Sequence, residues 1–157
     1  MFGLIRKLRR RKLAKRPFPE AWLAPLQEHV PFFAPLEGEL RECFFRQLKF
    51  FVWEKTFIGA GGLEVTDEMR VVIAATAVRL TLHLDLDYYA RLTEVIVYPS
   101  AYKHPDDDES MILGEAQDWG TVVLAWDAVL AGLKNTEDGL DTATHEFAHV
   151  LDRGGGA

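Results

Sequence analysis

The sequence predicts an α+β fold in which several helices accompany a small sheet. Its 157 residues are 48% hydrophobic and 11% aromatic, which is enough for one domain with a real core. Apolar residues recur at helical spacing in the first half of the chain, and two short segments rich in β-branched residues follow. A last helix, which carries the most informative motif, comes after these strands. This order of elements is typical of α+β domains.

Residues 1–16 form a basic arm that differs from the rest of the chain. They hold eight of the 18 Lys and Arg residues and no acid, so residues 17–157 carry ten basic and 24 acidic side chains and a formal charge of −14. We expect the arm to be a solvated tail or a short exposed helix; contact with anionic lipid or nucleic acid is the alternative. The acidic body lacks a basic and aromatic stripe, which argues against specific nucleic-acid binding.

The arm does not have the pattern of a secretory signal peptide. Arginines interrupt its apolar residues, whereas a signal peptide needs an unbroken apolar stretch after its charges. No later segment is long and apolar enough to span a bilayer. The single cysteine, Cys43, excludes an intramolecular disulfide, and its apolar neighbours predict a buried structural side chain. We therefore expect a reducing compartment, the cytoplasm.

Two helices are predicted after the arm. The first runs from about Pro19, which suits an early helical position, to Val30. The second covers about residues 36–54, after a break at "PFFAPLEGEL". Its apolar residues fall at helical spacing and predict packing in the core. They are Leu40, Phe44, Leu48, Phe51 and Val52.

A glycine-rich loop, "GAGGLEVTDEMR" at residues 59–70, precedes a third helix. The loop lacks the Lys-Ser/Thr pair of a P-loop and the GxGxxG spacing, so we do not expect it to bind phosphate. Thr66 or Asp67 is expected to cap the helix over about residues 67–84. Because "VVIAATAVRLTL" is apolar nearly all round, this helix is predicted to lie at the centre of the domain.

Two strands are predicted at residues 93–99 and 121–127, where β-branched and aromatic residues concentrate. The segment between them is polar, acidic and rich in turn formers. His104 lies beside three aspartates there, residues 106–108, and could be read as a metal cluster. A solvated acidic loop is the favoured interpretation, because consecutive residues of a loop seldom converge on one ion.

The segment "DTATHEFAHVLD" at residues 141–152 contains the HExxH pattern. On a helix, His145 and His149 lie one turn apart, so both imidazoles can bind one Zn²⁺ ion. Glu146 is about 100° further round the helix and would reach the bound water. In such sites the glutamate takes a proton from water activated by zinc and later donates it to the leaving amine. The spacing therefore predicts a zinc site with Glu146 as the catalytic residue.

A helical projection places the two histidines away from the expected core. The apolar residues of this helix share one arc, and His145 and His149 point to the opposite side. Histidines buried for packing would share the apolar arc, which leaves metal ligation or a chance pattern on an exposed face. The predicted core residues are Leu140, Ala143, Phe147, Val150 and Leu151.

A catalytic zinc usually has three protein ligands, and the sequence supplies only two at this motif. Asp152 is the sole carboxylate after His149. It lies seven residues from His145, a rise of about 10 Å, which is too far for one helix to wrap a single ion. We expect no third ligand from this sequence.

Three segments, taken together and in order, resemble a known family. They are "LTEVIVYPSAY" at 92–102, "DWGTVVLAWDAVLAG" at 118–132 and "HEFAHVLD" at 145–152. The chain is similar to the Mlc titration factor A group of zinc-dependent peptidases, the M90 metallopeptidases. The resemblance implies that His145 and His149 bind zinc and that Glu146 is catalytic. It also implies that a glutamate ligand and a catalytic tyrosine belong to a later segment without counterpart here.

The resemblance implies a zinc-dependent peptidase that acts on a peptide or protein. Residues 17–157 are then expected to be the N-terminal portion of a zincin-like domain whose C-terminal part is missing, with weak or no activity alone. The alternative is a non-catalytic binding protein that sequesters a transcriptional repressor such as Mlc. An unrelated zincin, or a remnant that does not fold stably, are further alternatives.

Overall fold

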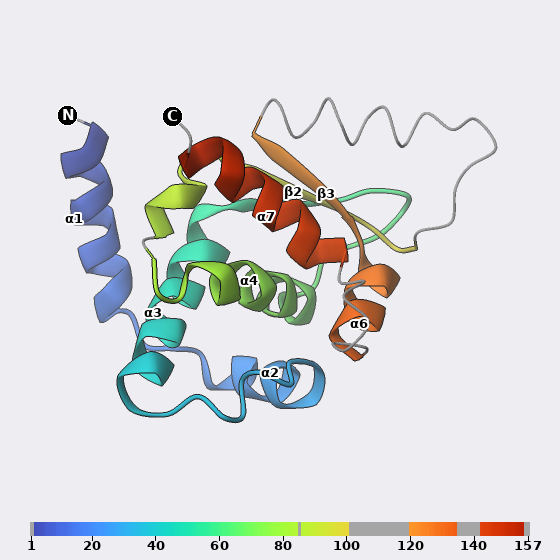
Figure 1. Cartoon of the computed structure of the whole chain (residues 1–157), viewed down its shortest axis with the longest axis horizontal. Coiled ribbons are helices and arrows are strands. Elements are labelled where there is room, and N and C mark those ends of the chain that lie inside the picture. The colour runs from blue at the N-terminus through green and yellow to red at the C-terminus, as the bar shows by residue number, and fades with distance from the viewer. Residues whose placement is uncertain (1, 85, 101–119, 135–141, 156–157) are drawn as a thin grey trace.

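The computed structural model describes residues 2–84, 86–100, 120–134 and 142–155, in which helices cover a small sheet (Figure 1). α7 crosses in front of the strands, and α1 stands at one end of the molecule beside α3. The helices are α1 (Phe2–Lys15), α2 (Leu23–His29), α3 (Gly38–Glu54), α4 (Asp67–Thr81), α6 (Trp126–Lys134) and α7 (Thr142–Gly155), with 3-10 turns η1 (Glu20–Trp22) and η2 (Leu86–Tyr89).

The sheet has three parallel strands in the order β1-β2-β3. They are β1 (Thr56–Gly59), β2 (Glu94–Tyr98) and β3 (Thr121–Ala125). Val95 in the middle strand pairs with Phe57 on one side and with Val122 on the other. Because β1 and β2 are parallel, the chain must cross back between them, and α4 makes this crossing. The three strands therefore end at the same edge of the sheet.

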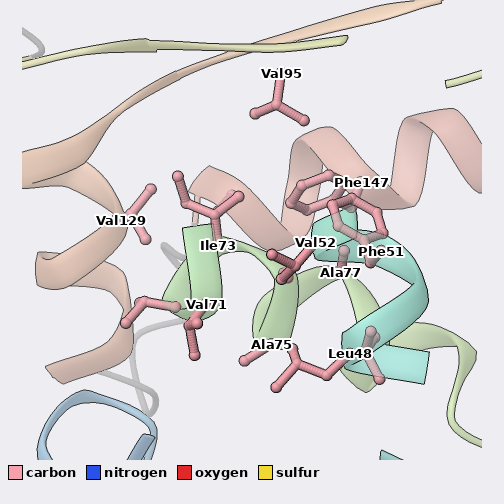
Figure 2. Packing of buried hydrophobic residues seen from close by; sticks show 14 of the residues in the cluster. Leu48, Phe51, Val52, Val71, Ile73, Ala75, Ala77, Val95, Val129 and Phe147 are labelled. Atoms are coloured by element: carbon pink, nitrogen blue, oxygen red, sulfur yellow. The ribbon is translucent and has the colours of Figure 1, made fainter. Parts of the chain in front are cut away.

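The core lies between one face of the sheet and the helices. α4 is at its centre, because every residue from Val71 to Val78 is buried, and α3 and α7 both pack against it. Figure 2 shows the side chains of α3, α4 and α7 meeting below Val95 of the sheet. Val97, Val122 and Leu124 belong to the same buried cluster. The apolar run that predicted a central helix is thus explained by contacts on all sides.

The predicted elements agree with the structure, with differences at their ends. A helix-rich domain with a small sheet is present, as the α+β prediction required. Thr66 caps α4, because its side chain accepts a hydrogen bond from the Met69 backbone N–H at 3.3 Å. The last predicted strand was too long, since Trp126 already begins α6. β1 was not predicted, because it has four residues that are mostly exposed.

Leu40 is a correction to the predicted core stripe of α3. Its side chain is 40% exposed, whereas Phe44, Leu48 and Phe51 are fully buried. Leu40 lies in the first turn of α3, which begins at Gly38, whereas the buried residues of this helix begin at Phe44. The helical period predicted which face of α3 is buried, but not at which residue the burial begins.

The basic arm is helical and is docked on α3. Arg10 Nε pairs with Glu54 Oε2 at 3.0 Å, and both side chains are largely shielded from solvent. Lys49 Nζ of α3 donates to the backbone oxygens of Ala14 and Arg16, at 2.9 and 2.8 Å. These are carbonyls at the C-terminal end of α1, which have no partner within the helix. Within the described residues, no helix has the length and apolarity that crossing a membrane requires.

Candidate metal centre

α7 is fixed in place by its apolar face. Ala143 and Phe147 are fully buried, and Val150 and Leu151 pack partly buried against the core. The helix contacts α4, α6, β3 and η2. The predicted core face of this helix is therefore confirmed for these four residues, and Leu140 lies outside the described residues.

Phe147 is the central anchor of this packing. Its ring meets those of Phe51 and Tyr89, each with centroids 5.8 Å apart and in edge-on geometry. Such arrangements stabilise aromatic pairs beyond the area that they bury. Figure 2 shows Phe147 pointing from α7 toward Phe51 of α3. These ring contacts pack the helix that carries the HExxH motif against the hydrophobic core.

Tyr89 also packs against α7, and no sequence pattern predicted this role. Its side chain is fully buried, and its hydroxyl donates a hydrogen bond of 2.7 Å to the backbone oxygen of Ala77 in α4. Burial raises the pKa of Tyr89 well above its ordinary value, because the phenolate would lose its hydration. The residue therefore stays neutral and bridges α4 and α7 with its ring and its hydroxyl.

The polar face of α7 carries the three predicted site residues. His145 and His149 are exposed, and Glu146 is half-buried, with its Oε2 atom shielded from solvent. Residues four apart on a helix are neighbours on its surface, so the two imidazoles lie on one side of α7. Glu146 lies between the exposed histidines and the buried face that Phe147 marks. The expectation that the histidines point away from the core is confirmed.

This arrangement fits a zinc ion in its chemistry. Neutral imidazole nitrogens are the preferred nitrogen ligands of zinc, and two of them one turn apart on a rigid helix can bind the same ion. Among the described residues, one group of three side chains could together bind a metal ion, and it does not include His145 or His149. These two histidines therefore have no third protein ligand in the described part of the chain. The side chain of Asp152 is outside the described part.

The other group consists of Glu28, His29 and Glu68, and sequence reasoning missed it. Its three potential ligand atoms lie within 4.8 Å of one another, at the end of α2 and the first turn of α4. His29 Nε2 is 2.8 Å from Glu68 Oε1 and 3.8 Å from Glu28 Oε2. A direct hydrogen bond accounts for the shorter contact, and both glutamates are exposed. No local spacing could reveal this group, because Glu68 lies 39 residues after His29 in the sequence.

The remaining sequence interpretations have different outcomes. His104 and the aspartates at 106–108 lie outside the described residues. Cys43 is half-buried instead of fully buried, because it lies where α3 faces the end of α4, and its sulfur accepts a hydrogen bond from Gln47 Nε2 at 3.4 Å. In the glycine-rich loop, Gly61 and Gly62 have φ of +62° and +81°, so a tight turn explains these glycines without a phosphate.

Comparison with known proteins identifies the family. Residues 5–157 match the glucose-regulated metallo-peptidases M90. A protein of Synechocystis sp. is 37% identical over 160 residues, which cover 95% of this chain and 58% of that protein. Mlc titration factor A of Cronobacter sakazakii is 25% identical over 146 residues, which cover 85% of this chain and 53% of that protein. The chain spans little more than half the length of these relatives, and its match over nearly all of its own length shows that it belongs to the M90 family of metallopeptidases.

Proposed function

We propose that this chain carries the metal-binding half of a zinc-dependent peptidase site, in a zincin-like arrangement. One observation carries the proposal: His145 and His149 are exposed on one side of α7, while Phe147 on the other side is fully buried. A helix fixed by its core face holds two ligands at a constant separation. Family membership supports the same activity.

The chain's own residues have distinct roles in this proposal. His145 and His149 each offer a neutral imidazole nitrogen to the ion. Bound zinc would polarise the carbonyl of a peptide bond and make water more acidic. Glu146 accepts the proton of the attacking water and then donates it to the departing amine. Its Oε2 atom is shielded from solvent, and the residue is next to His145 on the same helix, so the carboxylate lies close to the proposed ligands.

The substrate class in this proposal is a peptide or protein in extended form. Among the described strands, β3 pairs with β2 and has its other edge open, and α7 contacts β3 directly. An open strand edge can add an extended peptide through main-chain hydrogen bonds. A substrate bound there would run beside the helix that carries Glu146. Cleavage of the substrate should therefore depend on the open edge of β3.

Activity of these 157 residues alone is proposed to be weak or absent. Two histidines leave the ion with fewer protein ligands than the usual three, so zinc is held less tightly and is less well oriented. The relatives extend well beyond the matched part, so turnover by the whole protein is also a proposal. In this proposal residues 17–157 form the part that binds zinc, and the arm at 1–16, which is docked on α3, contributes no ligand.

Zinc binding tests the proposal directly. The chain would be loaded with zinc, dialysed and measured by elemental analysis, together with His145→Ala/His149→Ala, Glu146→Gln and His29→Ala. We expect the chain, Glu146→Gln and His29→Ala to retain zinc, and the double variant to lose it. His29→Ala is the matched control, because it removes the histidine of the second group of potential ligands, which also contains Glu28 and Glu68. Equal zinc in the double variant, or loss in His29→Ala alone, would refute the assignment.

A second candidate function is binding without catalysis. The name of one relative, Mlc titration factor A, describes a protein that titrates Mlc. Applied to this chain, the alternative is that its surface sequesters a transcriptional repressor. Glu146→Gln separates the two functions, since a peptidase loses turnover while a binding protein keeps its affinity. Fluorogenic-peptide cleavage and calorimetry with purified Mlc repressor would be measured on the same preparation.

A further inference from the structure

Three large aliphatic side chains of α1 are exposed to solvent. Leu4, Ile5 and Leu8 are 65%, 50% and 51% exposed. At about 100° per residue they fall within one arc of about 100° on the helix surface. We call these three residues the apolar ridge. A single exposed aliphatic side chain is ordinary, but three neighbouring ones on one helix face form an apolar patch, which is typical of a binding surface.

The apolar ridge points away from the protein body. The residues of α1 that are half-buried, Arg6, Arg10 and Leu13, lie on the opposite arc of the helix. That arc faces α3, where Arg10 pairs with Glu54 and its guanidinium lies 5.3 Å from the centroid of Phe50. Figure 1 shows α1 at the margin of the molecule, with α3 as its neighbour. The ridge is therefore not part of the core of the described protein.

Cations surround the apolar ridge. Five further Lys and Arg side chains of the helix are exposed, and the arm has eight Lys and Arg and no acid. The body behind it has a formal charge of −14. An anionic partner is attracted to the arm and repelled by the body. The exposed basic residues next to the ridge are Lys7, Arg9, Arg11, Lys12 and Lys15.

We propose that α1 binds the surface of an anionic phospholipid bilayer. The apolar ridge would enter the boundary between headgroups and acyl chains, and the flanking cations would contact the phosphates, as in interfacial amphipathic helices. A nucleic acid would use the charges but leave the ridge in water. A second copy of the chain would cover the ridge only by bringing two sets of like charges together. The bilayer is the partner that uses both features.

Vesicle sedimentation with the full chain tests this proposal. Vesicles of phosphatidylglycerol and phosphatidylcholine would be compared with phosphatidylcholine alone. We expect binding to the anionic vesicles, and loss of at least tenfold in affinity for Leu4→Ser/Ile5→Ser/Leu8→Ser. The control is a triple Ser variant of the same composition at exposed sites elsewhere, which should bind normally. These sites are Leu40, Ile58 and Leu84.

Charge is tested by a matched pair of variants. Lys7→Gln/Arg9→Gln/Arg11→Gln should weaken binding by about fivefold per charge removed, and added salt should reduce the difference. The control removes two Arg and one Lys from exposed positions of the body and should bind almost normally. Those positions are Arg46, Arg91 and Lys134.

Three results would overturn the proposal. The first is equal binding to anionic and neutral vesicles, which would indicate general stickiness. The second is a ridge variant that binds anionic vesicles as well as the parent chain does, together with binding of the parent chain to duplex DNA that is tighter than its binding to vesicles. This result would identify a site for polyanions. The third is a dimer in solution that the ridge variant makes monomeric, without vesicle binding. Circular dichroism would verify that each variant is folded, which exposed substitutions should allow.

Discussion

α7 and α1 are amphipathic helices that use their faces in opposite ways. α7 buries its apolar side and exposes two histidines, whereas α1 docks through charged side chains and exposes an apolar ridge. α7 is joined to the core by Phe147, and α1 is held by Arg10 and by Lys49. The buried face of each helix thus shows which contacts hold it in place, and the exposed face shows which groups can bind a ligand or partner.

Phe147→Ala should have the largest effect on this contrast. It removes the ring that contacts Phe51 and Tyr89 and leaves a cavity under α7. We expect a loss of about 3 to 5 kcal/mol in the free energy of unfolding, measured by urea denaturation. Leu8→Ala on the exposed face of α1 is the control and should change it by under about 0.5 kcal/mol. Similar effects of the two changes would contradict the assignment of buried and exposed faces.

Lys49→Met should release α1 without disturbing α7. Burial, with the nearby Arg46, lowers the pKa of Lys49, and its ammonium donates to the carbonyls of Ala14 and Arg16. Hydrogen bonds from charged groups contribute about 1.5 to 3 kcal/mol, and methionine keeps most of the aliphatic stem. The expected result is faster tryptic cleavage within the arm while the body remains protected. Lys134→Met, an exposed change outside the arm, should not alter the rate of cleavage within the arm.

Tyr89→Phe tests the support under α7 more gently. The ring and its contacts with Phe147 remain, and only the hydroxyl that donates to Ala77 is removed. We expect a loss of about 1 kcal/mol in the free energy of unfolding. Tyr88→Phe is the neighbouring control, because Tyr88 is 40% exposed. If Tyr88→Phe destabilised the protein as much, the hydroxyl of Tyr89 would have no special role.

His145→Ala/His149→Ala should have the smallest effect on stability. Both side chains are exposed, so without zinc the free energy of unfolding should change by less than about 0.5 kcal/mol. Thermal melting with and without zinc gives the measurement. Zinc should raise the melting temperature of the parent chain and leave that of the double variant unchanged. A large loss of stability in metal-free buffer would mean that the histidines pack structurally.

The sequence predicted elements whose signals are local. Helical spacing located α3 and α4, and the HExxH spacing placed His145 and His149 on the side of α7 opposite Phe147. Signals that depend on distant contacts were missed. Tyr89 acquires its role only because α4 and α7 meet over it, and no spacing in "DYYA" reveals that.

The arm was predicted only in part for the same physical reason. Its charge pattern indicated an exposed segment, but the docking of α1 depends on Glu54 and Lys49, which lie about forty residues further along. β1 is another case, since its four residues gain their partners from β2. Local periodicity therefore predicts which face of an element is apolar, and tertiary contacts decide how far each element extends and what holds it.

The buried phenol of Tyr89 should allow unfolding at alkaline pH to be followed by ultraviolet absorbance. In the unfolded chain this group ionises near its ordinary pKa of 10, whereas in the fold its pKa is raised, so the neutral form is favoured there. The contribution of Tyr89 to stability should therefore be fully present below pH 10 and decline above it. Ultraviolet absorbance of the Tyr89 phenolate would stay low while this side chain is buried. A later, cooperative rise would mark the opening of the α4–α7 junction.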